Sequence, residues 1–223
     1  TTQIIESAND QAAYVAIHIG SETAGSHIGG LRELPDILSN GRIHVCHINS
    51  YCRGVVDDAD LECKEALSIL SELTGQINSE SYNAVQNGTS GSCNRNGEAS
   101  SDVLRNCLKL GNFEPNIDGV RSAIKEGFAS VIGQRDETIV YLNGKEAINL
   151  YESAATNVGL SFPVNLPSSA FQLATSKTDT GEFIVDAVST DGGSHPRNIA
   201  IQTTAALVKF GALTPLEMVR KLS

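Results

Sequence analysis

Three side chains that can bind a metal or transfer a proton follow apolar runs of the sequence. His18 ends the run YVAIH, His47 ends the run IHVCH, and Asp191 follows the run EFIVDAVS at residues 182–189. Short apolar runs of this kind are typical of buried strands. In a parallel barrel the C-terminal ends of the strands share one rim, so the three side chains would converge there. Imidazoles and a carboxylate can bind a cation such as zinc, and the carboxylate can accept a proton from the bound water. His18, His47 and Asp191 are therefore candidates for a shared metal site.

A structural role for these residues is the alternative. Histidines at strand ends can bond to backbone groups or water, and Asp191 can cap the turn that it forms with the two glycines after it. His44 lies three residues before His47, an odd separation that places the two side chains on opposite faces of a strand. We therefore expect His44 to be structural, and the spacing alone leaves both interpretations of the other three residues open.

The periodicity of apolar residues indicates alternating strands and helices. Strands are expected at residues 14–17, 43–47 and 182–189, with a more polar one at 75–83. Helices are expected at residues 1–13, 31–38, 60–73 and 199–210, and from residue 214 onward. The last helix has Thr214 as N-cap, Pro215 at its first position and Glu217 as the capping-box partner. This alternation predicts an α/β fold with a parallel sheet.

The segment at about 87–170 interrupts the alternation. Residues 87–96 are rich in glycine, serine and asparagine and are expected to form a surface loop. Helices are expected at 100–110, 117–128 and 145–158, and a strand at 138–142. We interpret this segment as an insertion in a single domain that spans residues 1–223.

Composition argues against several classes of partner. The chain has 223 residues, of which 40% are hydrophobic, so it is long enough to bury a core. Its net charge of −10 argues against nucleic acid or an anionic membrane surface as the main partner. No apolar run approaches the roughly 20 residues that span a bilayer, and the first residues lack the features of a signal peptide. We therefore expect a cytoplasmic protein.

Cysteine usage indicates free thiols. The five cysteines form no C-x-x-C pair and their number is odd, which favours a reducing compartment over a disulfide framework. A site based on the thiol of Cys46 or Cys52, near His47, is a minor alternative. Otherwise Cys46 is expected to act as a small apolar residue within its strand.

Two regions of the chain resemble the amidohydrolase superfamily. The runs VAIHIGSETAG and GRIHVCHINS resemble its fifth and sixth strands, in particular the corresponding segment of urease catalytic subunits. The run AVSTDGGSHPR resembles its eighth strand, with an HPR sequence similar to the D-aminoacylase branch, and the tail GALTPLEMVRKLS resembles a late helix of many members. The resemblance covers about Tyr14 to Tyr51 and Val185 to Ser223.

This resemblance implies a TIM-barrel-type (β/α)8 metallohydrolase, of which the chain carries strands five to eight. His18, His47 and Asp191 would bind a divalent metal, with zinc as the first choice and nickel or manganese as alternatives. The reaction would be hydrolysis of a C–N bond in a small amide, cyclic amide or N-acyl amino acid, with Asp191 as the catalytic base. Four further residues are candidates for binding a substrate carboxylate: Tyr51, Arg53, His195 and Arg197.

Two features of the superfamily are missing from the sequence. The chain has no His-x-His pair, which the first strand of the family supplies, and no lysine before Lys64 to match the lysine of the fourth strand. We therefore expect the C-terminal half of a barrel that pairs with another copy or with the missing half. The alternative is a half-barrel without catalysis, serving as a scaffold or interaction subunit.

Overall fold

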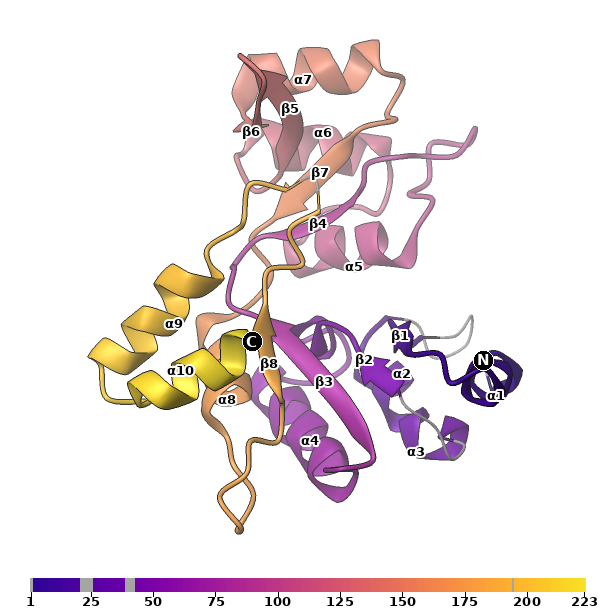
Figure 1. Cartoon of the computed structure of the whole chain (residues 1–223). Helices are drawn as coiled ribbons and strands as arrows, with labels where there is room; N and C mark the ends of the chain where they lie inside the picture. The colour runs from indigo at the N-terminus through magenta and orange to yellow at the C-terminus, as the bar shows by residue number, and fades with distance from the viewer. Residues whose placement is uncertain (1, 21–25, 39–42, 194) are drawn as a thin grey trace. The chain divides into compact units, whose positions relative to one another are not determined.

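The computed structural model describes residues 2–20, 26–38, 43–193 and 195–223 (Figure 1). These residues form two compact units. The parallel-sheet unit comprises the described residues of 1–83, 165–191 and 199–223, and the antiparallel unit comprises 84–164 and 192–198. Parts of the family-like runs, at residues 21–25, 41–42 and 194, lie outside the described residues.

The parallel-sheet unit contains a four-stranded sheet in the order β1-β2-β3-β8. Its strands are β1 (Val15–Ile17), β2 (Ile43–Val45), β3 (Ile77–Tyr82) and β8 (Ala187–Ser189). All neighbouring pairs run parallel, so the expected α/β fold with a parallel sheet is confirmed. Within the described ranges the sheet is open and does not close into a barrel.

Helices pack against this sheet. They are α1 (Thr2–Asp10), α2 (Ile28–Arg32), α3 (Leu34–Ile37), the 3-10 helix η1 (Ile48–Tyr51), α4 (Ala59–Glu72), α8 (Pro167–Thr175), α9 (Ala200–Lys209) and α10 (Pro215–Leu222). Ile43, Val45 and Ile77 alternate along β2 and β3 and belong to the same buried cluster as Leu31 of α2 and Leu70 of α4. Because successive strand residues face opposite sides, the residues between them lie on the other face.

Several predicted elements differ in extent from those observed. The strand expected at 43–47 ends at Val45, because His47 has a left-handed backbone and η1 begins at Ile48. The strand expected at 182–189 is reduced to β8, because Asp186 instead bonds through its backbone and its carboxylate to Ser79. The polar strand expected at 75–83 is the central strand β3. The capping box of Thr214 and Glu217 in α10 is present as predicted.

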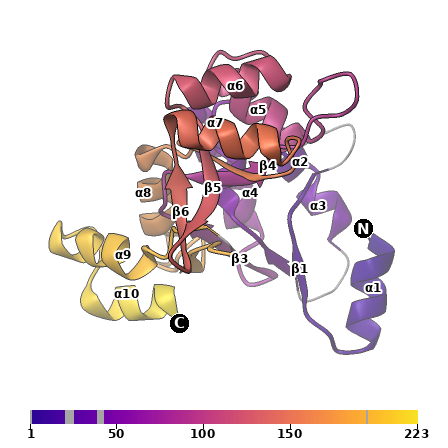
Figure 2. The ribbon, with the colours of Figure 1, turned by 90° about the horizontal axis from the view of Figure 1, so that it is seen from above.

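The antiparallel unit has a second four-stranded sheet, in the order β4-β7-β5-β6. Its strands are β4 (Asn87–Ser90), β5 (Ser130–Arg135), β6 (Thr138–Leu142) and β7 (Gly159–Phe162), and its helices are α5 (Asp102–Leu110), α6 (Ile117–Lys125) and α7 (Gly144–Ser153). Helix α7 packs on β5 and on α6 (Figure 2). The surface loop expected at 87–96 is wrong in its first part, because residues 87–90 pair with β7. This unit has its own buried core, which includes Leu108, Val131 and Phe162.

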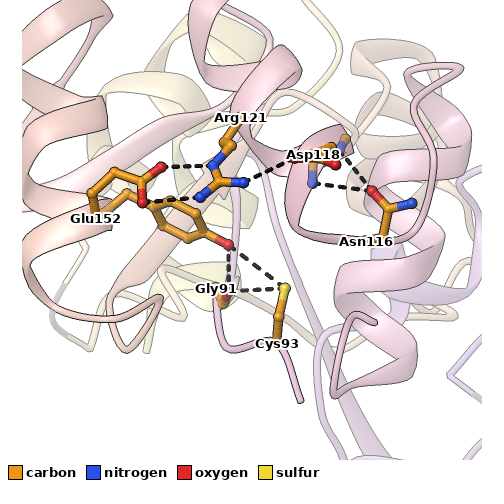
Figure 3. A network of polar contacts seen from close by, with 8 residues as sticks. Gly91, Cys93, Asn116, Asp118, Arg121 and Glu152 are labelled. Carbon is orange, nitrogen blue, oxygen red and sulfur yellow. Dashed lines mark hydrogen bonds and ion pairs between the residues drawn. The ribbon is translucent and has the colours of Figure 1, made fainter. Parts of the chain in front are cut away.

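Polar contacts join the helices of the antiparallel unit (Figure 3). Arg121 of α6 donates to both carboxylate oxygens of Glu152 at 2.6 and 3.0 Å and to Asp118 at 2.8 Å. Asn116 caps α6, since its side-chain oxygen accepts from two backbone N–H groups. The hydroxyl of Tyr151 donates to the carbonyl oxygen of Gly91 at 3.2 Å. These contacts fix α6, α7 and the chain after β4 within one unit.

No helix in the described ranges is both long enough and apolar enough to cross a membrane.

Gly119→Ala is expected to destabilise the chain, although alanine is favoured over glycine within a helix by about 1 kcal/mol. A Cβ at this position in α6 would lie 1.9 Å from the carbonyl oxygen of Glu114, a backbone atom. We expect the free energy of unfolding to fall by about 1–3 kcal/mol, as for other overpacked sites. Denaturant unfolding followed by circular dichroism measures this change. Ser122→Ala on the same helix is the control and should be neutral, and an unchanged stability of Gly119→Ala would contradict the packing argument.

Candidate functional site

The C-terminal edge of the parallel sheet brings two predicted site residues together. The register pairs Ile17 of β1 with Val45 of β2, and His18 and His47 follow these residues in the chain. Their imidazole ring centroids are 4.9 Å apart, with the ring planes inclined by 32°. Nε2 of His18 lies 2.5 Å from the hydroxyl of Ser26. Two imidazoles at neighbouring strand ends are thus close enough to share a ligand.

The backbone of His47 is left-handed, with φ 38° and ψ 61°. This conformation is uncommon for a residue with a side chain. It ends the strand alternation, so the expectation that His44 and His47 occupy separate faces fails. Both side chains instead approach Glu80 of β3.

Glu80 is a buried carboxylate that sequence reasoning missed. One of its oxygens accepts from the backbone N–H of His47 at 2.7 Å and lies 3.4 Å from Nδ1 of the same residue. Its other oxygen accepts from the hydroxyl of Ser189 in β8. Burial raises the pKa of Glu80, but the hydrogen bonds from His47 and Ser189 outweigh it, so the net pKa is lowered. The polar run INSESY, at a position between two buried strands, is the signal that could have revealed this residue.

Glu80 orients the His47 ring. Because Nδ1 is the nitrogen near the carboxylate, Nε2 is left as the nitrogen that could bind a metal. Carboxylates that hold the second nitrogen of a ligand histidine fix its tautomer and raise its basicity.

His18 is held in its neutral form. Burial, the neighbouring His47 and the charge of Arg53 lower its pKa to about 4, while the carboxylate of Asp191 acts in the opposite direction. A neutral imidazole is the form that binds metal. Asp191 is half-buried, follows β8 and has a positive φ of 41°. The charge of Asp191 acts on His18. Burial raises the pKa of the Cys46 thiol, and the charges of Glu80 and Asp191 add to this effect.

Tyr51 and Arg53, which follow the C-terminal end of β2 in the chain, are both buried. The hydroxyl of Tyr51 accepts from the backbone N–H of Ile19 at 2.7 Å, and its ring centroid is 5.6 Å from that of His18. Burial raises the pKa of Tyr51, so its hydroxyl stays protonated. The guanidinium of Arg53 donates to the side chain of Asn165 at 2.8 Å and to Ser50 at 3.1 Å.

His195 and Arg197 have contacts within the antiparallel unit. Arg197 is buried and donates to the carbonyl oxygen of Gln86 at 3.1 Å. The His195 ring packs against Gly88 of β4, where a Cβ would lie 1.9 Å from the ring. The structure thus gives both residues packing partners on that unit.

A second set of possible ligands lies beside the predicted one. In the described part of the chain, His44, Cys46 and Glu80 form the set of three whose ligand atoms all lie within 4.8 Å of one another. The trio of His18, His47 and Asp191 does not form a set this tight, although its two imidazoles adjoin. The edge of the sheet therefore carries two groups of residues with metal-binding chemistry.

Comparisons with known proteins add no relative to this geometry. No protein-family model matches the chain, and neither the search of curated proteins nor that of solved structures found a match.

The metal-free chain is expected to show an imidazole pKa of about 4 for His18. The unfolded chain takes up this proton near pH 6.5, whereas the folded chain takes it up only near pH 4. Neutral His18 therefore contributes its full stabilisation above pH 6.5, and this contribution is lost as the pH falls from 6.5 to 4. Imidazole nitrogen shifts followed by NMR against pH, after removal of metal with a chelator, measure the pKa. His47→Ala should raise it, since the neighbouring positive charge is removed. A His18 that titrates near 6.5 in the unmodified chain would refute the assignment.

Proposed function

We propose that the chain forms part of a metal-dependent hydrolase of C–N bonds in small amides, cyclic amides or N-acyl amino acids. The observation that carries the proposal is the 4.9 Å separation of the His18 and His47 rings at the ends of neighbouring parallel strands. Functional residues of (β/α)8 enzymes gather at this end of the strands. The order β1-β2-β3-β8, which follows the chain, supports equating these strands with strands five to eight of such a barrel.

His18 and His47 would hold the metal. The neutral state of His18 and the contact of His47 Nδ1 with Glu80 both suit imidazole ligands of a divalent ion. Zinc fits this chemistry, and nickel and manganese are alternatives. Such an ion, when bound, lowers the pKa of water toward about 7 and polarises a carbonyl group.

Asp191 would act as the catalytic base. Its carboxylate would accept the proton of the attacking water and return it to the leaving nitrogen. Glu80 would hold the backbone of His47 through a hydrogen bond and orient its ring through the contact with Nδ1. Arg53, whose charge acts on His18, is a candidate for orienting a substrate carboxylate. Tyr51 would hold the backbone of Ile19, next to His18, through its hydroxyl.

The open sheet favours association. Within the described residues, β1 and β8 each pair with a strand on one side only. Open strand edges tend to pair with other chains, which is consistent with a homo-oligomer or with pairing to the rest of a barrel.

Metal analysis and hydrolysis assays of the purified protein test this function. We expect about one or two divalent ions per chain, and His18→Ala is expected to lower that number. Asp191→Asn is expected to lower turnover of N-acyl amino acids or cyclic amides by about 10²- to 10⁴-fold, the usual contribution of a general base.

His27→Asn is the matched control, because His27 caps α2 and asparagine is also a good N-cap. It should leave metal content and turnover unchanged. A chain that purifies without metal and hydrolyses none of these substrates would overturn the proposal and favour a non-catalytic scaffold. Normal turnover by Asp191→Asn with metal bound would refute the role of Asp191.

A further inference from the structure

The face of the sheet opposite the apolar core carries a group of metal-binding side chains. His44 lies in β2, and Cys46 is the first residue after this strand, two positions beyond His44. Because side chains alternate along a strand, these two leave the same face, while Ile43 and Val45 point into the core. A histidine and a cysteine therefore lie one above the other along β2.

The neighbouring strand β3 supplies a third group at the same level. Val45 pairs with Ser79, so the residues that follow, Cys46 and Glu80, are level with each other. The ligand atoms of His44, Cys46 and Glu80 all lie within 4.8 Å of one another. Zinc bond lengths of about 2.0–2.3 Å place tetrahedral ligand atoms roughly 3.3–3.8 Å apart, so a small inward movement of the side chains would complete such a site.

The carboxylate of Glu80 is held by hydrogen bonds and still has lone pairs that could bind a cation. The backbone N–H of His47 donates to one oxygen and the hydroxyl of Ser189 to the other. A carboxylate has about four lone-pair positions, so each oxygen can still bind a cation. Glu80 is only 7% exposed, and His44 and Cys46 are half-buried. Glu80, the charged member of the three, is thus also the one held by hydrogen bonds to both of its oxygens.

We propose that His44, Cys46 and Glu80 form a metal site, distinct from His18, His47 and Asp191, that binds a borderline divalent cation such as Zn²⁺. One imidazole, one thiolate and one carboxylate suit zinc or cobalt, whereas magnesium and calcium require oxygen ligands. Three protein ligands leave a fourth position for water or a small ligand. The site shares no ligand with the proposed hydrolytic site, although Glu80 also contacts His47 of that site.

Cobalt binding to the purified full chain tests this site, because cobalt(II) reports a thiolate ligand by a charge-transfer absorption in the near ultraviolet. After treatment with a chelator, titration with cobalt is expected to produce this band with one equivalent per chain. Cys46→Ser should abolish the band. Cys93→Ser is the matched control: Cys93 is also half-buried and free, but it lies in the antiparallel unit. This control should keep the band.

Two further variants separate this site from the proposed hydrolytic one. His44→Gln should weaken cobalt binding roughly tenfold or more, with the fold checked by circular dichroism. His18→Ala should leave the charge-transfer band unchanged, whatever it does to hydrolysis. Absence of the band in the unmodified chain, its persistence in Cys46→Ser, or its loss in His18→Ala would each overturn the proposal. Loss of the band in Cys46→Ser, with a normal band in His18→Ala, would support it even if no amide is hydrolysed.

Discussion

The buried carboxylate of Glu80 organises the edge of the parallel sheet. A carboxylate removed from water is costly unless hydrogen bonds replace its hydration. Glu80 receives those bonds from the backbone of His47, after β2, and from Ser189 of β8. The same interaction that compensates for its burial therefore ties three strands together and sets the position of the His47 ring.

The fold and the site differ in how far the sequence could predict them. The strands around Val15 and Ile43 and the helices at 59–72 and 200–209 were predictable from apolar periodicity, although the buried faces of the two helices also include Glu62, Cys63 and Thr204. The importance of β3 was harder to see, because Ser79, Glu80 and Ser81 are buried through hydrogen bonding and sheet pairing rather than through apolar character. Likewise, the left-handed backbone of His47 depends on a partner 33 residues away, which no local pattern reveals.

The pairing of β3 with β8 bridges the whole inserted segment. The register joins Glu80 to Ala187 and Tyr82 to Ser189, although the chain forms the antiparallel unit between them. The entropy lost on closing a loop grows only with the logarithm of its length, so a long insertion adds little to the free energy needed for this pairing. The inserted segment also has its own buried core, which includes Leu108 and Val131.

At position 47 the stability of the fold and the chemistry of the site favour different residues, because the backbone of His47 is left-handed. A residue with a Cβ in this conformation costs of order 1–3 kcal/mol unless its surroundings hold it there, and glycine would adopt the same angles without that cost. Selection for stability alone would therefore favour glycine at position 47. Directed evolution for heat resistance would then be expected to replace His47 before residues of the core. Retention of histidine at this position would therefore indicate selection for function.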